Sequence, residues 1–474
     1  MIADLKPYPD YKESGLPWLG RVPGHWEVRR LKLLLHEVDS RSTTGKEQLL
    51  RVSQYTGVTQ RKSVDGSDTP DTRASSLVGY KRVMPSDLVI NIMLAWNGSM
   101  GVSRYDGIAS PAYCVYRFKA GAMPWYYHEL LRLPLYKGRI KTASTGVVES
   151  RLRLYSDDLG RIEVPQPPPD EQAAIVRFLD WANGRLERAI RAKRKVIALL
   201  NEQKQAIIHR AVTRGLDPDV PLKPSGIPWL GDIPKHWEAQ RLGHVVSLLT
   251  GFPFPSNGFS EGAGGVPLLR GINVTPGKIR WDSTVSWKRR PTDGLDEFEL
   301  AAGDVVLGMD RPIVGSGVRA AVIQEKDVPA LLLQRVARLR PTAALVADYL
   351  MLLLQGRVFA DYMTPIFTGI SVPHLSPQQI RDFRIGLPRI GEQEAIVSSI
   401  RRDTKNLDLT ANRLNREIEL LREYRTRLVA DVVTGKLDAR AAAARLPDAA
   451  PPDSLDSEPD PGDEPELADE EAVA

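Results

Sequence analysis

Residue types that carry out catalysis occur in this sequence without the spacing that their chemistry requires. The seven histidines lack the two-histidine helical spacing of a zinc protease. Gly45-Lys46 is followed by Glu47, and Gly435-Lys436 by Leu437, where a phosphate-binding loop needs Ser or Thr. The sequence therefore argues against a zinc peptidase and against an ATP-driven motor.

A nuclease-like set of two carboxylates and a lysine can be assembled from Asp170, Glu202 and Lys204. Asp170 and Glu202 lie 32 residues apart on what we predict to be one straight helix, a distance of about 48 Å, so they cannot share a metal ion. The sequence also lacks an Asn-Pro-Pro-Tyr-type base-methylation motif. We therefore expect no catalytic residue and no metal site here, and we expect another subunit to supply any chemistry.

Polar side chains that could read DNA bases occur in two long segments broken by Gly, Pro, Asn and Asp. Base reading requires donors and acceptors such as those of Arg, Lys, Asn and Gln, with further basic groups for the phosphates. The candidates in the first segment are Arg51, Ser53, Gln54, Arg61, Lys62, Asn91, Trp96, Asn97, Arg151 and Arg153. Those in the second are Arg270, Asn273, Arg311, Ser371 and His374. The indole of Trp96 could either pack in the core or wedge against a nucleotide.

The charge of the chain is distributed unevenly. Residues 447–474 contain eleven Asp and Glu and no Lys or Arg, so the rest of the chain carries 64 basic against 48 acidic groups, a surplus of 16. Such a surplus is typical of proteins that bind phosphate backbones, although a basic protein without a nucleic-acid partner would show it too. The acidic tail has too few apolar residues to order itself, so we expect it to be disordered.

Cysteine content and hydropathy indicate the compartment. Cys114 is the only cysteine, which excludes an internal disulfide and a cysteine-rich zinc site and fits a reducing environment. No run of about 18 apolar residues exists, and Met1–Asp10 lacks a basic region followed by an apolar one. We expect a cytoplasmic protein with neither a membrane span nor a secretory signal.

Two long helices are the strongest structural prediction. Glu171–Thr213 and Glu392–Thr434 contain no proline and, apart from Gly184, no glycine, and each would span about 65 Å as a helix. Apolar residues recur in steps of three and four at matching places in both stretches, which predicts coiled-coil packing, with each helix as the nearest partner of the other. The residues expected to form this helix-pair seam are Leu179, Leu186, Ile197, Leu200, Ile207, Leu407, Leu414, Ile418, Leu421 and Leu428.

The helices belong to a larger repeat. Ser14–Glu27 recurs as Ser225–Glu238 at an offset of 211, and we call these two stretches the frame segments. Glu171-Gln172 recurs as Glu392-Gln393 at an offset of 221. Between these signatures lie two dissimilar inserts with β-rich pieces and a helix late in each, near residues 125–140 and 344–363. Two different inserts in one duplicated frame suggest a protein that reads two different things in one geometry.

The motifs with the most specific pattern are Tyr11–Gly20 with Pro23 and His25-Trp26, Gly107–Tyr113, the proline-rich entry to Glu171-Gln172, and the repeats of the outer motifs at 225–238 and 388–397. In this order they resemble the specificity subunits of type I restriction-modification enzymes. The resemblance covers about residues 8–440. The acidic tail departs from the pattern of that family.

The resemblance implies a mixed α/β (α+β) fold in which two target-recognition domains in a pseudo-twofold arrangement are separated by two long antiparallel coiled-coil helices. The corresponding segments are an N-terminal frame segment at 1–27, target-recognition domain 1 at 28–165, a helical spacer at 166–216, the repeated frame segment at 217–238, target-recognition domain 2 at 239–388, a second helical spacer at 389–440, and the disordered acidic tail at 441–474.

The resemblance also implies a function and partners. The chain would be the non-catalytic DNA-specificity subunit of an adenine-methylating and DNA-cleaving complex, and each domain would read one half of a split target in double-stranded DNA. Two DNA methyltransferase (modification) subunits would dock on the helices, with restriction/translocase subunits joining indirectly. This chain would hold no cofactor, because S-adenosylmethionine, ATP and Mg would act on the partner subunits. Unlike inserts imply unlike half-sites.

The residues alone leave two other interpretations open. The chain could be an adaptor whose basic inserts bind protein or RNA, or a one-component restriction enzyme whose catalytic part is missing. Steeply salt-dependent binding to duplex DNA would favour DNA reading over the adaptor. The one-component enzyme would require a fused methyltransferase or nuclease domain, and this sequence encodes no motif of either.

Overall fold

The computed structural model describes residues 5–61, 74, 76–148, 151–260, 264–282, 284–290, 292–315, 317–367 and 373–447. Most of the acidic tail therefore lies outside the described residues, from residue 448 onward. The first residues of the predicted tail, which begins at residue 441, are among the described ones. Helix α10 (Arg440–Ala444) contributes Ala442 and Ala443 to a buried core that also contains Trp26, and Leu446 after it is buried as well.

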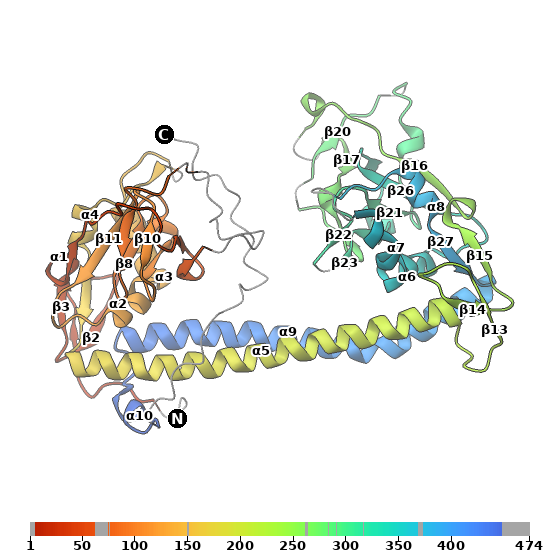
Figure 1. Cartoon of the computed structure of the whole chain (residues 1–474). Helices are drawn as coiled ribbons and strands as arrows, with labels where there is room; N and C mark the ends of the chain where they lie inside the picture. The colour runs from red at the N-terminus through yellow and green to blue at the C-terminus, as the bar shows by residue number, and fades with distance from the viewer. Residues whose placement is uncertain are drawn as a thin grey trace. The chain divides into compact units, whose positions relative to one another are not determined.

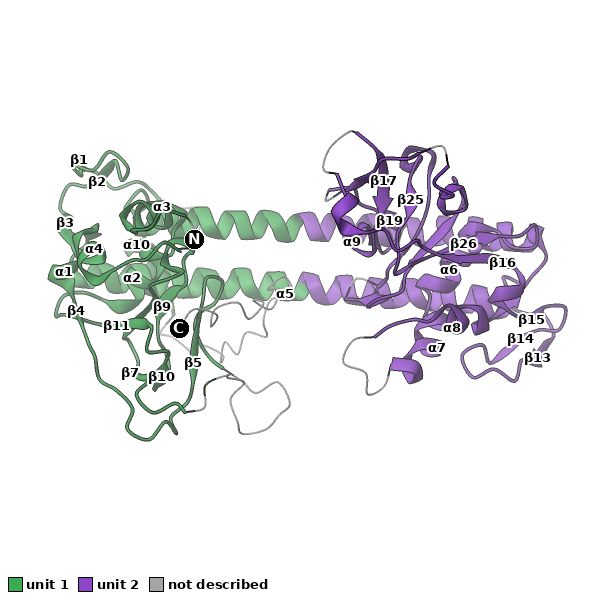
Figure 2. Cartoon of the chain, turned by 90° about the horizontal axis from the view of Figure 1, so that it is seen from above, with its two compact units in different colours: residues 1–192, 417–474 green, residues 193–416 purple. Residues whose placement is uncertain are grey.

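The chain is divided into two units that share two long helices. Unit 1 comprises residues 1–192 and 417–474, and unit 2 comprises residues 193–416. Helix α5 (Pro169–Arg214) begins in unit 1 and ends in unit 2, whereas α9 (Ile390–Val433) begins in unit 2 and ends in unit 1 (Figure 2). Each unit is therefore completed by a helical segment distant in the sequence.

The other elements of unit 1 are short (Figure 1). Its strands are β1 (Tyr11–Glu13), β2 (Arg21–Pro23), β3 (Glu27–Arg30), β4 (Leu35–Glu37), β5 (Leu50–Ser53), β6 (Gly57–Gln60), β7 (Lys81–Val83), β8 (Leu88–Asn91), β9 (Met100–Val102), β10 (Gly107–Ala109), β11 (Tyr113–Phe118) and β12 (Glu163–Gln166). Its helices are α1 (Leu31–Leu34), the 3-10 helix η2 (Ala95–Asn97), α2 (Pro124–Leu131), α3 (Pro134–Ala143) and α4 (Ser156–Arg161).

Unit 2 repeats this organisation with additional short strands. Its strands are β13 (Leu222–Pro224), β14 (Asp232–Pro234), β15 (Glu238–Arg241), β16 (Val246–Thr250), β17 (Val266–Leu269), β18 (Val274–Thr275), β19 (Lys278–Ile279), β20 (Ser286–Trp287), β21 (Val305–Gly308), β22 (Ile313–Val314), β23 (Gly317–Val318), β24 (Ala320–Val322), β25 (Leu331–Leu332), β26 (Val336–Pro341) and β27 (Arg384–Leu387). Its helices are α6 (Ala347–Gln355), α7 (Arg357–Phe367) and α8 (Pro377–Asp382), with 3-10 turns η4 (Leu242–His244), η5 (Ser256–Gly258), η6 (Gly271–Asn273), η7 (Asp296–Phe298) and η8 (Glu325–Asp327).

The predicted mixed α/β fold is confirmed, and each insert contains its own four-stranded sheet with the same strand order. The order is β4-β11-β8-β9 in unit 1 and β16-β26-β21-β24 in unit 2, and every neighbouring pair is antiparallel. The strands of the second sheet follow those of the first in the same chain order. The inserts are therefore two versions of one scaffold, although their sequences differ widely.

An ion pair with a buried carboxylate and a partly exposed arginine, at the start of the third strand in the sheet order, is common to both sheets. Asp87 precedes β8, is almost fully buried, and accepts two hydrogen bonds from Arg117 of β11, at 3.0 and 3.2 Å. Asp304 precedes β21, is equally buried, and accepts two from Arg340 of β26, at 2.6 and 2.7 Å. A fork of two parallel bonds fixes the orientation of both side chains, so the same side-chain fork orients the same strand pair in each unit.

The helix predicted late in each insert is interrupted in the structure. Residues 125–140 form α2 and α3, which are separated because Leu133 precedes a proline and takes an extended conformation, with ψ of 145°. Residues 344–363 form α6 and α7, with Gly356 extended between them. Each insert therefore presents two short helices joined by a bend.

The two long helices pack on each other within each unit. In unit 1, Phe178 and Leu179 of α5 share a buried core with Val429 and Val432 of α9. In unit 2, the final turns of α5 and the first turns of α9 contribute to one core in the same way. Of the helix-pair seam residues, Leu179, Leu186, Ile418 and Leu428 are buried, and Ile197, Leu200, Ile207, Leu407, Leu414 and Leu421 are half-buried.

One ion pair between the helices occurs twice. Glu187 pairs with Arg425 at 3.8 Å in unit 1, and Lys204 pairs with Asp408 at 2.6 Å in unit 2. The pairs are copies of each other, because adding 221 to 187 and 204 gives 408 and 425. Exposed pairs of this kind stabilise a helix pair only slightly, but their repetition indicates the same helix register in both units. No helix among the described residues combines the length and the apolar character needed to cross a membrane.

Candidate nucleic-acid interface

The repeated Glu-Gln pair holds each frame segment on the start of a long helix. Glu171, in the first turn of α5, is buried and accepts hydrogen bonds from Tyr8 Oη at 2.5 Å, His25 Nε2 at 2.7 Å and Trp26 Nε1 at 2.9 Å. Burial and the Glu171 carboxylate together raise the pKa of Tyr8 well above its ordinary value, so its hydroxyl stays protonated and donates. The frame histidine and tryptophan thus have an anchoring role.

Unit 2 contains the same anchor with one donor fewer. Glu392 accepts from His236 Nε2 and Trp237 Nε1, both at 3.0 Å. Its side chain is 29% exposed, against 4% for Glu171. The repeat of Glu at offset 221 and of His-Trp at offset 211 is explained by this contact, because the two signatures touch each other in both units.

The glutamine of each pair orients the insert. Gln172 is fully buried; its Oε1 accepts from the Met123 backbone N–H at 2.8 Å, and its Nε2 donates to the backbone oxygens of Gly121 and Pro167. Gln393 makes the matching three bonds to the segment before α6 and to Pro388. Because a buried amide is satisfied by backbone groups alone, this contact tolerates different insert side chains.

Two turns that contain predicted base-reading residues lie together in unit 1. The first joins β5 to β6 and contains Ser53 and Gln54; the second follows β8 and contains Trp96 and Asn97. Ser53 is buried, and its Oγ accepts from the Tyr55 N–H at 3.1 Å. Gln54, Trp96 and Asn97 are half-buried. The Trp96 indole donates to the Met93 carbonyl oxygen, and its ring lies 5.5 Å from the Lys141 ammonium.

Arg132, which was not among the predicted residues, contacts both turns. It follows α2, and its guanidinium donates to the backbone oxygens of Gln54 at 3.1 Å and Tyr55 at 2.8 Å in the first turn. It also donates to the oxygen of Gly98 at 3.5 Å in the second turn and to that of Met100 at 2.6 Å, where β9 begins. The sequence signal that could have found it is an arginine among the aromatic and leucine residues of Trp125–Leu133, because a charged side chain in such a stretch must be buried and paired.

The electrostatics beneath these turns favour a neutral histidine beside a charged arginine. His128 is half-buried, and burial of its ring, followed by the nearby charges of Arg132 and Arg104, lowers its pKa to about 3. Its neutral ring accepts the Val102 backbone N–H at Nδ1, 3.0 Å away. Burial raises the pKa of the neighbouring Glu129. His128 and Arg132 therefore have a structural role here, because both bond to backbone atoms at or near the turns.

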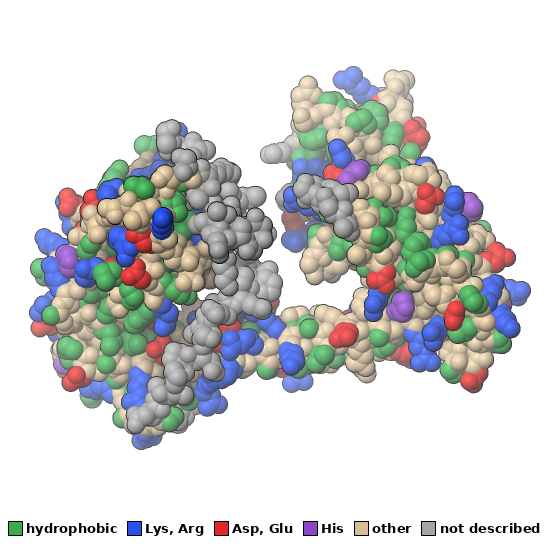
Figure 3. Space-filling model, viewed as in Figure 1, with side chains coloured by type: hydrophobic (Ala, Val, Ile, Leu, Met, Phe, Trp, Pro, Cys, Tyr) green, Lys and Arg blue, Asp and Glu red, His purple; other side chains and the backbone are tan. Residues whose placement is uncertain are grey.

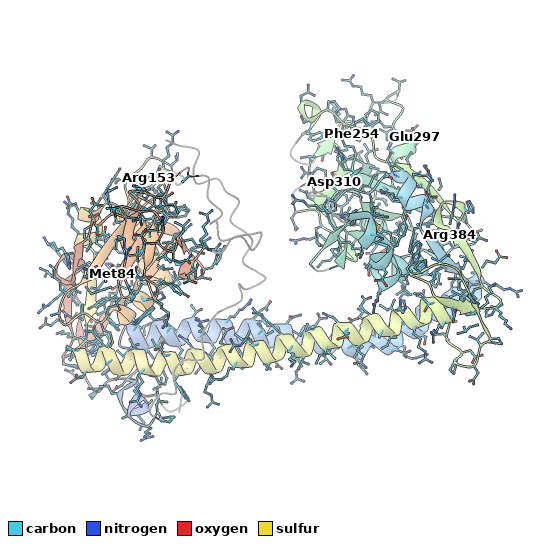
Figure 4. The ribbon with its side chains drawn as sticks, in the orientation of Figure 1. Met84, Arg153, Phe254, Glu297, Asp310 and Arg384 are labelled. Atoms are coloured by element: carbon cyan, nitrogen blue, oxygen red, sulfur yellow. The ribbon has the colours of Figure 1, made fainter. Side chains whose placement is uncertain are left out.

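The other predicted residues of unit 1 differ in burial. Arg51 and Arg151 are exposed, and Arg61 is half-buried. Asn91 is fully buried, and its Oδ1 accepts from the Met93 N–H at 3.0 Å, so it shapes the turn after β8. Arg153, labelled in Figure 4, exchanges backbone hydrogen bonds with Thr145, both at 2.9 Å. Lys62 lies outside the described residues.

In unit 2 the structure brings two of the predicted residues together. Asp310 and His374 form a β-bridge, and the Arg311 N–H next to it donates to the Pro373 oxygen at 2.8 Å. The His374 Nδ1 donates to the Asp310 carboxylate at 2.6 Å (Figure 4 labels Asp310). Arg335 reaches the same carboxylate at 3.3 Å. Arg311 has φ of 44°, a left-handed conformation that side chains seldom adopt, and it is exposed. Ser371 lies outside the described residues.

The remaining predicted residues of unit 2 belong to the turn η6. Asn273 is buried; its Oδ1 accepts from the Arg270 N–H at 3.0 Å, and its Nδ2 donates to the Arg280 carbonyl oxygen at 2.9 Å. Arg270 is half-buried, and Ile272 between them is exposed. Asn273 therefore holds the turn, and the side chains that the turn presents to solvent are its neighbours.

Arg319 connects the two turn regions of unit 2 and was also missed by the sequence analysis. It lies between β23 and β24, where its Nε donates to the Val274 oxygen at 3.2 Å and its Nη1 to the Asp310 oxygen at 3.1 Å. The surrounding sequence, Val318–Val322, is otherwise apolar, which is the same signal that marks Arg132.

On the face shown in Figure 3, basic side chains occur on both units, interspersed with acidic ones. Among the described residues, no group of three His, Cys, Asp or Glu side chains is placed to hold a metal ion.

Comparison with known proteins agrees with the geometry. Residues 234–420 match the family model described as the type I restriction modification DNA specificity domain. The MjaVIII type I restriction enzyme specificity subunit of Methanocaldococcus jannaschii is 27% identical over 446 residues, which covers 90% of this chain and 97% of that protein. The EcoAI specificity subunit of Escherichia coli is 29% identical over 275 residues, covering 57% of this chain and 41% of that protein.

The fold is also found among solved structures. A chain solved in work on complex assembly and conformational transition of the type I R-M system superimposes with a TM-score of 0.60 at 15% identity, over 88% of this chain and 99% of that one. The chain is therefore similar over most of its length to type I restriction enzyme specificity subunits, and residues 234–420 match their DNA specificity domain.

Proposed function

We propose that this chain recognises a bipartite sequence in double-stranded DNA, with each unit reading one half, and directs methylation and cleavage by partner subunits. The observation that supports the proposal is that the two units have the same scaffold but different turns. The sheet order, the Asp-Arg fork and the Glu-Gln anchors are repeated, whereas the turns that follow β8 and β21 differ in length and in side chains. A repeated scaffold with unlike turns suits a protein that reads two unlike half-sites.

The long helices would set the gap between the half-sites. Each runs without interruption from one unit into the other, and the repeated ion pairs fix the same register at both ends. The exposed sides of these helices would dock two DNA methyltransferase subunits, and restriction/translocase subunits would join through them. S-adenosylmethionine, ATP and Mg would act on those partners, because this sequence contains neither a base-methylation motif nor a phosphate-binding loop.

The electrostatic part of the proposal predicts a steep salt dependence. The basic surplus of 16 outside the acidic tail supplies phosphate contacts. With six to ten such contacts, affinity for duplex DNA should fall by roughly 10³- to 10⁵-fold between 50 and 200 mM salt. Binding of the full chain to fluorescent duplexes, with and without its methyltransferase partner, measures this slope.

Sequence discrimination should appear only in the complex with the methyltransferase, where a specific target should bind at least about 10³-fold more tightly than random duplex. Single-stranded RNA of equal length serves as the control ligand. Salt-independent binding, or tighter binding to the RNA than to any duplex, would count against a DNA-reading role.

A further inference from the structure

Arg132 fixes the backbone of two turns and leaves their side chains free. Its bonds end on the oxygens of Gln54 and Tyr55 in one turn, and on those of Gly98 in the other turn and Met100 directly after it. The contact therefore does not depend on which side chains these positions carry. The Tyr55 side chain at the tip of the first turn is 56% exposed, although it is large and aromatic. An exposed aromatic ring on a rigidly held turn is suited to contact with a partner.

Arg319 does the same in unit 2 with different turns. It ties the strand after η6, through the Val274 oxygen, to the turn after β21, through the Asp310 oxygen. The apolar side chain of Ile272 in η6 is 60% exposed, and Arg311 next to Asp310 is exposed as well. The turns after β8 and β21 leave equivalent strands of the two sheets, so both arginines act at the same place on the common scaffold.

We propose that Arg132 and Arg319 are positioning residues for the two base-reading surfaces, and that Gln54 and Tyr55 in unit 1, and Ile272 and Arg311 in unit 2, are the side chains they present to DNA. The inference rests on the proposed function. A glutamine or arginine can pair with base edges in the major groove, and an apolar side chain can contact the methyl group of thymine. Because each arginine serves one unit only, each controls the reading of one half-site.

The chemistry of the arginine side chain explains why lysine cannot replace it. A guanidinium presents five donors in a rigid plane and can serve several carbonyl oxygens at once, whereas an ammonium is a point charge on a flexible stem. Arg132→Lys keeps the positive charge but releases one of the two turns. Base discrimination depends on placement of the contacting atoms, so a turn that moves loses preference for its base without any loss of charge.

The test maps methylated adenines in a host without adenine methylation of its own, in which the full chain is expressed with its methyltransferase partner. For Arg132→Lys, methylation of the wild-type sites should fall about tenfold, which is the size of one lost base contact, and the motif should relax in one half only. For Arg319→Lys, the other half should relax. Arg161→Lys and Arg357→Lys, at arginines that are 68% and 71% exposed, are the matched controls and should leave both halves unchanged.

Two further variants separate positioning from folding. Tyr55→Ala and Ile272→Ala alter exposed side chains without touching the core, and each should relax the same half as the lysine variant of its unit. If the base preference of both halves relaxed equally in each lysine variant, the arginines would only stabilise the protein. A wild-type split motif that stays unchanged in Arg132→Lys and Tyr55→Ala would overturn the inference, whereas the absence of a split motif in the wild type would overturn the proposed function instead.

Discussion

Glu171→Ala should lower the free energy of unfolding of the chain by about 3 kcal/mol and loosen unit 1 first. The substitution removes the acceptor shared by Tyr8, His25 and Trp26, and the two aromatic donors are buried. Their O–H and N–H groups would remain buried without a partner, and buried donors without partners account for most of the cost. Urea denaturation of the full chain measures the free energy, and hydrogen exchange shows which unit opens.

Two other glutamate-to-alanine substitutions provide a comparison for the loss of unfolding free energy. Glu187→Ala on the same helix removes only the 3.8 Å pair with Arg425 and should cost less than about 0.5 kcal/mol. Glu392→Ala removes the matching anchor of unit 2, where the carboxylate is partly exposed and has two donors, so its cost should lie between the other two. A Glu171→Ala protein as stable as Glu187→Ala would refute the anchoring role of the Glu-Gln signature.

Lengthening both long helices by seven residues should widen the gap between the half-sites by about three base pairs, because seven residues add about 10.5 Å and a base pair spans about 3.4 Å. The insertions belong after Ala192 in α5 and after Arg413 in α9, which are equivalent at the offset of 221. Three base pairs also rotate the second half-site by about 100° around the duplex, so the lengthened protein should methylate its new sites less efficiently. Sequencing of methylated adenines gives the gap directly.

An insertion in α5 alone should abolish methylation of cognate sites. Glu187 and Lys204 are separated by 17 residues, and so are their partners Asp408 and Arg425, which allows both ion pairs to form on one helix pair. A heptad in one helix makes these separations unequal and shifts the apolar contacts of one unit by two turns. If matched lengthening left the gap unchanged, the helices could not be what sets it.

The long helices were predictable because their signal is local. Their length follows from an absence of proline, and their apolar spacing directly gives the face that packs. The frame segments were recognisable as a repeat, but their partner was not. Nothing in the spacing of Trp26 and Glu171 shows that the two side chains meet, because 145 residues separate them and only the tertiary fold closes that distance.

The base-reading surfaces were only partly predictable for a related reason. Polar residue type identified Gln54 and Arg311, which are accessible, but also Asn91 and Asn273, whose amides hold turns from inside. An asparagine that faces a groove and one that closes a turn look alike in a sequence. The position of Arg132 among aromatic and leucine residues indicates a buried and paired arginine, but its partners are backbone oxygens that the sequence does not identify.

The sequence also did not show that the sheets of the two inserts have the same strand order. Its four strands keep their order in both units, but the turns between them vary in length, so no constant offset aligns the inserts. Only the fork that joins an aspartate before one strand to an arginine in the next is visible in both, as Asp87 with Arg117 and Asp304 with Arg340. Its spacing of 30 residues in one copy and 36 in the other obscures the repeat.

The central claim is that this chain recognises a DNA target in two halves. The most direct test of this claim is to determine the sequence of the methylated sites. DNA from a host that lacks adenine methylation should acquire methyl groups when this chain and its methyltransferase partner are expressed together, and none when either is expressed alone. The account predicts one split motif, with two different halves separated by a gap of constant length. Methylation at a single uninterrupted motif, or the same motif with and without this chain, would contradict it.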